Sequence, residues 1–428
     1  MGLEQFINNS VGEGFVTPSQ MANADPFPLL GRQSVQGLKK VCIIQPILTD
    51  YCLPVFLELA GYCQVDLVFS RSAAESGFGE PATPSVPGVR YFLVPTLKPF
   101  GESMGMIQWG LGKYICRERP CAIFTFANPR YLSFWMTLLW GKVLGIPTYA
   151  HGHGLYKKRT IGMLYRLMMT ALLRLVTSYT CYAPAVRQSF IDHGFSEQKL
   201  TVAHNSLINR FPVRPQEKTG KERGVLFIGR LRQGNNVGLL VRTMERIRRE
   251  DGLPLMLHVI GTGEEAQLLG KETGGRSWIV FHGRTYDQKR IREISLDCFL
   301  GCYPGDAGLS VVHMMSLSLP VILHDDLHTH GPEASFIRNG VSGFLYDHKN
   351  PEESLYRAIR SLASDPPMLA RMRQAAYDDY QNLVNPSLAV RLWSILCGGQ
   401  GVPQEDSSVA RRWTPKPSVK SQPEADGS

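Results

Sequence analysis

The chain has 428 residues and a formal net charge of +9, with 43% hydrophobic and 19% charged residues. This length accommodates two domains with full cores, and the composition is that of a soluble globular protein rather than a disordered one. No run reaches the roughly 18–20 uninterrupted apolar residues of a membrane span. The positive charge comes without a zinc-finger spacing, a ribonucleoprotein motif or a helix-turn-helix, so nucleic acid is not an expected partner.

Strands and helices alternate along the first half of the chain. We expect a poorly ordered segment over 1–37 and an N-terminal domain over 38–208. The predicted strands lie at 39–46, 65–69, 122–125, 147–150 and 178–182. The predicted helices lie at 54–63, 131–145, 161–176 and 184–193. This alternation predicts an α/β domain with a parallel sheet.

The second half repeats the pattern after a segment of linker composition. Residues 209–222 carry Pro212, Pro215 and Gly220 among several charges. The strands predicted beyond them lie at 224–229, 255–260, 278–281, 298–302 and 320–323. We therefore expect a second α/β domain over 223–365, helices over 366–398 and a disordered tail over 399–428.

Four predicted strands of the second half end in glycine-bearing or polar turns. The turns lie at 229–236, 261–264, 283–285 and 304–308. Because the carboxyl ends of parallel strands share one edge of a sheet, these turns are predicted to converge on one ligand.

The turn at 304–308 is the most informative of the four. It joins the buried strand 298–302 to a helix that starts near Leu309, which directs free backbone N–H groups at the carboxyl edge of the sheet. Such a helix start favours an anion, and Arg230 in the first turn adds a guanidinium for phosphate oxygens. The sequence predicts a phosphate-bearing ligand; a plain crossover without a ligand is the alternative.

These motifs together resemble glycosyltransferase family four of the GT-B fold, over roughly residues 40–395. The resemblance rests on motifs in both halves: Gly229-Arg230-Leu231, Gly261-Thr262-Gly263, Gly308-Leu309 through Pro320-Val321-Ile322, Pro332-Glu333, Asn339-Gly340, Gly343-Phe344-Leu345, His151-Gly152-His153-Gly154 and His204-Asn205-Ser206. It implies two Rossmann-like domains that face each other across a cleft, with the helices after about residue 366 crossing back to the first domain.

By the same resemblance, the second domain holds a nucleotide-diphosphate sugar. The protein would then be a retaining hexosyltransferase that acts on a hydroxyl of a glycan or glycolipid. No metal and no cofactor beyond the donor are expected. The residues predicted to bind the donor are Gly229, Arg230, Arg232, Asn235, Gly261, Gly283, Asp306, Gly308, Leu309, Ser310 and His313. The residues predicted to act on the reacting groups are His151, His153 and Glu333.

The chain departs from the family pattern at three positions. Two Glu residues eight positions apart are replaced by Gly305 and His313, and a Lys that reaches the diphosphate is replaced by Asn235. His313 is interpreted as a replacement contact to the ribose, and Arg232 as the replacement cation. These departures leave two further functions open: a GT-B protein that binds nucleotide sugar without turnover, and a nucleotide-sugar epimerase.

Two other clusters have alternative interpretations. His324, His328 and His330, with Asp325 and Asp326, match no closed metal site, which favours a loop. The basic run at 157–159 precedes a helix that reaches 176, which is either a membrane contact for a lipid-linked acceptor or a domain-packing helix with a solvated basic end. Nine scattered cysteines are typical of reduced thiols, so a cytoplasmic location is expected, at the inner face of the membrane under the first interpretation.

Overall fold

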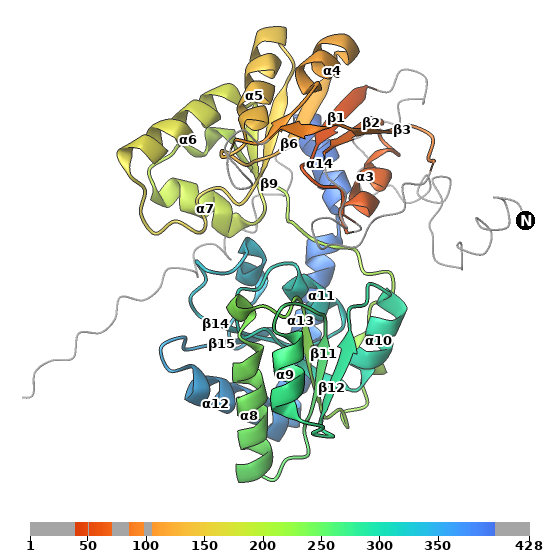
Figure 1. The fold of residues 1–428 in the computed structure, drawn as a ribbon, viewed down its shortest axis with the longest axis vertical. Coiled ribbons are helices and arrows are strands. Elements are labelled where there is room, and N and C mark those ends of the chain that lie inside the picture. The colour runs from red at the N-terminus through yellow and green to blue at the C-terminus, as the bar shows by residue number, and fades with distance from the viewer. Residues whose placement is uncertain (1–38, 50, 71–84, 98–104, 399–428) are drawn as a thin grey trace, which may run out of the picture.

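The computed structural model describes residues 39–49, 51–70, 85–97 and 105–398; the terminal segments predicted over 1–37 and 399–428 lie outside them. Two α/β domains follow one another along the chain, stacked along the long axis of the molecule (Figure 1). Each is built on one parallel sheet with helices packed against it, as the alternation of strands and helices predicts. No helix in the described part is long and apolar enough to cross a bilayer.

The N-terminal domain has a seven-stranded parallel sheet in the order β3-β2-β1-β6-β7-β8-β9. Its strands are β1 (Lys40–Ile44), β2 (Gln64–Phe69), β3 (Val89–Leu93), β6 (Ala122–Phe126), β7 (Thr148–Gly152), β8 (Ser178–Cys181) and β9 (Leu200–Val202). Its helices are α3 (Leu53–Leu59), α4 (Leu111–Glu118), α5 (Leu132–Leu144), α6 (Met163–Leu175), α7 (Pro184–Asp192) and the 3-10 turn η2 (Glu197–Lys199). A separate antiparallel pair joins β4 (Thr96–Leu97) to β5 (Ile107–Gln108).

The C-terminal domain has a six-stranded parallel sheet in the order β12-β11-β10-β13-β14-β15. Its strands are β10 (Gly224–Ile228), β11 (Met256–Ile260), β12 (Ile279–Gly283), β13 (Cys298–Cys302), β14 (Val321–His324) and β15 (Gly343–Tyr346). The α-helices that follow the linker are α8 (Val237–Glu250), α9 (Ala266–Thr273), α10 (Gln288–Leu296), α11 (Ser310–Ser316), α12 (Pro351–Ser364), α13 (Pro366–Val384) and α14 (Leu388–Leu396). The 3-10 turns are η3 (Pro215–Glu217), η4 (Gln233–Asn235) and η5 (Pro332–Phe336).

The strand order of both sheets reverses at one place. In the C-terminal sheet the reversal lies between β10 and β13, and in the N-terminal sheet between β1 and β6. Ligands of open parallel sheets bind at the carboxyl ends of the strands beside such a reversal, because the connecting helices diverge there to opposite faces. The turns after β10 and β13 are therefore the positions where this topology favours a ligand.

The two helices after residue 366 serve different domains. α13 places Met372 and Leu383 in the core of the C-terminal domain. α14 reaches the N-terminal domain, where Leu388 and Leu392 pack in the core that contains α3. The crossing back to the first domain is made by α14 and not by α13.

Two buried charged residues bind the end of the linker to the C-terminal domain. Lys218 is 8% exposed, and its Nζ donates to the carbonyl oxygens of Ser295 and Cys298, the latter at 2.9 Å. Glu222 forms an ion pair with Arg373 of α13 at 3.0 Å, with side-chain exposures of only 2% and 7%. The end of the segment predicted as a linker is thus bound to the C-terminal domain.

We expect Glu222→Ala to lower the free energy of unfolding by about 3–5 kcal/mol, because it leaves the Arg373 cation buried without a partner. Chemical denaturation of the purified variant measures this loss. Glu352→Ala is the matched control: Glu352 also pairs with an arginine, Arg242 at 3.2 Å, but its side chain is 67% exposed. Its loss should stay below about 1 kcal/mol. Equal losses in the two variants would contradict the role given to the buried pair.

Candidate functional site

The turns after β10 and β13 lie against each other at the strand reversal. The Asp306 N–H donates to the Gly234 carbonyl oxygen at 3.1 Å, which joins the two turns through their backbones. The turn after β11 is joined to the first one, because the Leu231 N–H donates to the Thr262 carbonyl oxygen at 3.0 Å. The strand ends predicted to converge therefore form a continuous edge.

Glycine is required where these turns approach most closely. The Gly261 N–H donates to Gly283 at 2.8 Å, and a Cβ at Gly261, whose φ is 147°, would overlap the Gly229 carbonyl oxygen. A Cβ at Gly305 would lie 2.5 Å from the Cα of Asn235. The position where the family pattern has Glu is filled here by the backbone of the first turn.

Asn235 holds the first turn together from inside. It is 1% exposed, its amide nitrogen donates to the Arg230 carbonyl oxygen at 2.5 Å, and its amide oxygen accepts from Arg232 Nε at 3.2 Å. Arg230 and Arg232 themselves are exposed residues. Among the predicted donor-binding residues of this turn, the two arginines are therefore exposed at the surface, whereas the side chain of Asn235 is hydrogen-bonded inside the turn.

His330 holds the second turn, although the sequence favoured only a loop there. Its Nδ1 accepts the Ala307 N–H at 3.0 Å, and its Nε2 lies 3.0 Å from the His324 carbonyl oxygen. Because Nδ1 accepts, Nε2 carries the proton and the ring is neutral; burial lowers the pKa of His330 to about 3, so it stays neutral at physiological pH. The Gly331 N–H donates to the Ala307 carbonyl oxygen at 2.6 Å, which fixes both backbone groups of Ala307.

His313 lies on α11, just beyond the partly exposed Gly308, Leu309 and Ser310. Its Nε2 is buried, and the described residues offer it no hydrogen-bond partner. Burial lowers the pKa of His313 to about 4, so the ring is neutral at physiological pH. Buried polar atoms are usually paired, so this nitrogen is a candidate to bind a ligand group.

The predicted histidines of the N-terminal domain share one aromatic partner at the carboxyl end of β7. The ring of Tyr182 lies 4.3 Å from that of His151 and 4.8 Å from that of His153 between centroids. Burial lowers the pKa of His151 to about 3 and that of His153 to about 4. Neutral imidazoles can accept or donate one hydrogen bond at each nitrogen but carry no charge.

Glu333 joins this cluster from the other domain. It is 3% exposed and accepts a hydrogen bond from the side-chain amide of Asn205, which follows β9. Burial raises the pKa of this carboxyl, against the lowering effect of Asn205. Burial also raises the pKa of Tyr182, and the nearby Glu333 carboxylate adds to that increase. His151, His153, Tyr182, Asn205 and Glu333 thus gather where the two domains meet, and sequence reasoning had not selected Tyr182.

Further contacts join the domains beside this cluster. Lys157 Nζ donates to the Thr329 carbonyl oxygen at 2.7 Å, and Arg159 pairs with Asp326 at 2.8 Å. These contacts extend from the loop after β7 to the loop after β14. The carboxyl ends of the two sheets therefore face each other.

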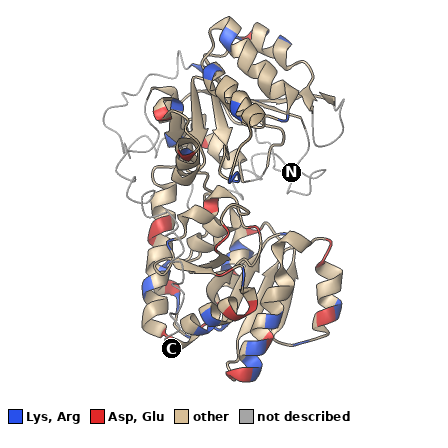
Figure 2. Cartoon of the chain, turned by 90° about the vertical axis from the view of Figure 1, so that its left-hand side faces the viewer, with Lys and Arg blue, Asp and Glu red and all other residues tan. Residues whose placement is uncertain are grey.

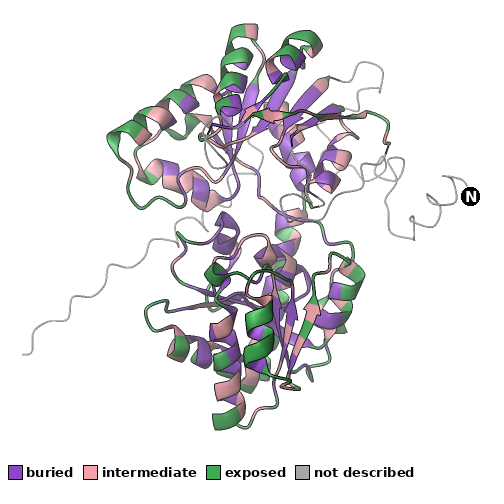
Figure 3. Ribbon diagram, viewed as in Figure 1, coloured by how far each residue is buried: buried purple, intermediate pink, exposed green. Residues whose placement is uncertain are grey.

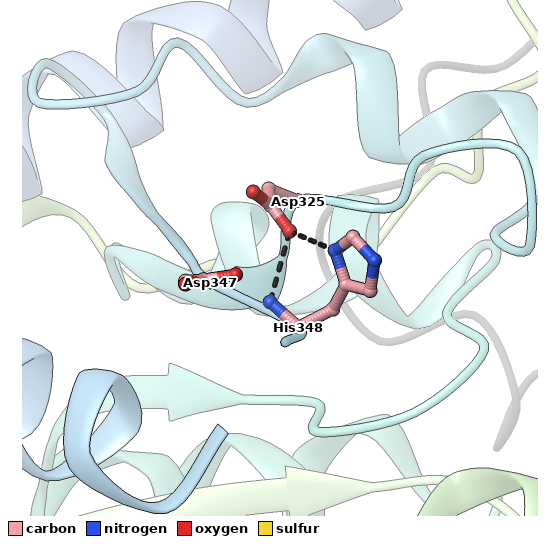
Figure 4. Close-up of side chains that lie close together, drawn as sticks. All are labelled: Asp325, Asp347 and His348. Atoms are coloured by element: carbon pink, nitrogen blue, oxygen red, sulfur yellow. Dashed lines mark hydrogen bonds and ion pairs between the residues drawn. The ribbon is translucent and has the colours of Figure 1, made fainter. Parts of the chain in front are cut away.

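The histidine-rich loop after β14 does not gather into one metal site. Asp326 is paired with Arg159, and His330 holds the second turn. Asp325, Asp347 and His348 do lie together, with one ligand atom of each within 4.8 Å of the others (Figure 4). All three are exposed, and Asp325 already accepts from His348 Nδ1 at 2.6 Å.

Comparison with known proteins places this arrangement in a known fold. Residues 210–379 match the family described as Glycosyl transferases group 1. HepE of Anabaena, solved in complex with UDP and glucose, has a TM-score of 0.61 and 14% identity, covering 84% of this chain and 99% of that one. The pneumococcal O-GlcNAc transferase GtfA, in complex with UDP and GlcNAc, has a TM-score of 0.60 and 11% identity, covering 85% and 99%. A search of curated proteins finds no match.

At these identities the likeness establishes the fold, and it confirms the fold that the sequence predicts. The chain has two Rossmann-like domains in the GT-B arrangement, and the second of them matches the group 1 glycosyltransferases.

Proposed function

We propose that this protein is a retaining glycosyltransferase that moves a hexosyl unit from a nucleotide-diphosphate sugar to a hydroxyl of a glycan or glycolipid. The observation that carries the proposal is the position of Glu333. It lies in η5, which follows β14, close to the turn after β13, and it is hydrogen-bonded to Asn205 of the other domain. Proteins of the same fold solved with UDP and glucose, with UDP-glucose, and with UDP and GlcNAc support a nucleotide-sugar donor.

The donor diphosphate would lie at the edge formed by the joined turns. Arg230 and Arg232 supply cations for its oxygens, and glycines at the strand ends let the ligand approach the backbone. The turn held by His330 presents its backbone at a fixed position, which lowers the cost of organising the site when the ligand binds. His313 would contact the nucleoside through its unpartnered nitrogen.

The transfer would proceed on one face of the sugar. The bond from the anomeric carbon to the leaving diphosphate oxygen breaks, and the bond to the acceptor oxygen forms on the same face. The acceptor proton passes to the departing phosphate oxygen, so atoms and charge balance without a protein general base. Glu333 would hold hydroxyls of the donor sugar, and the neutral His151 and His153 would orient the acceptor. Stabilising the leaving group and positioning the reactants then supply the catalysis.

Arg230→Ala should weaken binding of the donor nucleotide about tenfold to a hundredfold, because a charge-assisted hydrogen bond contributes about 1.5–3 kcal/mol. The probe is the nucleoside diphosphate that most raises the melting temperature of the wild-type chain, and calorimetry measures its affinity. Arg249→Ala is the control, since Arg249 is also exposed but lies at the far end of α8 from the turns. Wild-type affinity in the Arg230→Ala variant, or no nucleotide that binds the wild type, would contradict the donor site.

Glu333→Gln should abolish most transfer yet stabilise the fold at neutral pH. The raised pKa means that burial disfavours the ionised carboxylate, so Glu333 costs stability above its folded pKa and not in acid. We expect the melting temperature at pH 8 to rise by roughly 2–4 °C, the shift that about 1 kcal/mol produces in a domain of this size. The gain should shrink towards pH 4. Glu250→Gln, at an exposed carboxylate paired with Arg246, should show no gain.

A nucleotide-sugar-binding protein without turnover is the second candidate. It is favoured by Gly305, because the backbone at Gly234 and Asn235 leaves no space for the Glu of the family pattern. Binding of a nucleotide sugar with neither hydrolysis nor transfer to any hydroxyl acceptor would favour this candidate over the transferase.

The packing at Gly305 can be tested by itself. Gly305→Ala should lower the free energy of unfolding by about 1–3 kcal/mol, because the turns must separate to admit a methyl group. Gly308→Ala is the matched control in the same turn, since its Cβ would meet Glu333 Oε2 only at 3.9 Å. Chemical denaturation compares the two. An equal effect of both substitutions would show that the contact between the turns is not the constraint.

A further inference from the structure

Exposed apolar side chains gather on two helices of the N-terminal domain. Of the 18 large hydrophobic side chains that are exposed in the described chain, eight lie on α5 and α6. Figure 3 shows both helices on the outer side of this domain, away from the C-terminal domain. Scattered exposed hydrophobic residues need no explanation, whereas a contiguous patch marks a binding surface.

The outward face of α5 is apolar along its length. Leu132, Met136, Leu139 and Val143 recur at intervals of three and four residues and are 39%, 43%, 52% and 76% exposed, and Trp140 lies beside them at 37%. The face towards the sheet is apolar as well, with Phe134 and Leu138 buried. A helix that is apolar on all sides is normally enclosed, yet none of the described residues covers the outward face of α5.

α6, which packs against α5, also carries exposed apolar side chains. Met163, Leu164 and Leu167 are 74%, 83% and 59% exposed. Met169 and Leu172 are the residues of α6 that are buried against the domain. The sequence left open that this helix packs against the domain, and only one side of it does so. We call the eight exposed side chains the α5–α6 face.

The chain segment that carries this face has charges of one sign. Residues 119–191, which include both helices, contain nine Lys and Arg and no Asp or Glu, a net charge of +9 that equals that of the whole chain. Figure 2 shows acidic residues mainly in the C-terminal domain. Lys142 lies in the last turn of α5 and Arg174 in the last turn of α6, and both are exposed.

We propose that the α5–α6 face docks on a bilayer that contains anionic phospholipid. Apolar side chains that enter the interface, surrounded by cations that meet lipid phosphates, are the composition that such binding needs. A second copy of this chain is disfavoured as the occupant, because pairing would bring two such positive surfaces together. The sequence left 157–176 open between a membrane contact and a domain-packing helix; the structure adds α5, which supplies most of the exposed apolar side chains.

One loop joins the docked face to the reaction site between the domains. α6 begins at Met163, a few residues after Lys157 and Arg159, whose loop contacts the C-terminal domain beside Glu333. This part of the inference rests on the proposed transferase function. It identifies the acceptor class as a lipid-anchored glycan whose head group reaches the space between the domains.

Vesicle co-sedimentation of the full chain, without nucleotide sugar, tests the docking independently of the transferase activity. We expect binding to vesicles with about 30 mol% phosphatidylglycerol in phosphatidylcholine to be at least about tenfold tighter than to phosphatidylcholine alone, and to weaken with salt. A Met163→Gln, Leu164→Gln and Leu167→Gln triple variant should lose about tenfold or more, as should Leu139→Gln with Val143→Gln. Because these side chains are exposed, the variants should melt at the wild-type temperature.

The matched control is Leu268→Gln with Val341→Gln, two side chains that are 55% and 44% exposed on the C-terminal domain. This variant should bind vesicles as the wild type does. The proposal is overturned if the wild-type chain does not co-sediment with anionic vesicles, or if the triple variant binds them as tightly as the wild type does. It is also overturned if the triple variant changes only the oligomeric state, since the face would then be a subunit interface.

Discussion

The hydrogen bond from the Asp306 N–H to the Gly234 carbonyl oxygen joins the turns on either side of the strand reversal. Two turns that meet through their backbones admit no side chain between them, which is why Gly305 stands where the family pattern has a carboxylate. Asn235 lies inside the first turn beside this contact. Its side-chain amide donates a hydrogen bond to the Arg230 carbonyl oxygen and accepts one from Arg232 Nε. Three departures that are separate in the sequence are therefore close together in the fold. Gly305 packs against the backbone of Asn235, and His313 lies on α11, the helix that follows the turn containing Gly305.

Buried polar groups surround the place where the two domains meet. Neutral histidines, a buried carboxylate and a tyrosine are each costly to remove from water unless they are hydrogen-bonded. Asn205 offsets part of that cost for Glu333, and the Ala203 carbonyl oxygen lies 3.4 Å from His151 Nε2. Such a cluster lowers the stability of the fold unless ligand groups complete its hydrogen bonds. Residues that act on a substrate are commonly buried at such a cost in stability.

Much of the fold could be predicted because its central strands are apolar on both faces. β10 and β13 read as continuous hydrophobic runs, since helices cover the sheet on either side. The strands of the two parallel sheets that sequence reasoning missed are edge strands: β3 is only half-buried, β9 has three residues and β15 has four. The short pair of β4 and β5 was missed as well. Periodicity over so few residues carries little signal.

The site was predictable only where a residue's role shows in its local pattern. Arg230 and the glycine turns follow strands, so their placement at one edge comes from topology. His330, Tyr182 and Asn205 act through neighbours more than 20 residues away along the chain, and no local spacing reports such contacts. The inward position of Asn235 likewise depends on the turn that packs against it.

The return of α14 to the N-terminal domain makes that domain discontinuous in sequence. Its core contains α3 and the first strands, but also Leu388 and Leu392, which lie more than 180 residues beyond β9. A fragment that ends before β10 would expose the surface that α14 covers. Chimeras that exchange N-terminal domains between proteins of this architecture must therefore carry the last helix with them, because the exchanged domain consists of two separate chain segments.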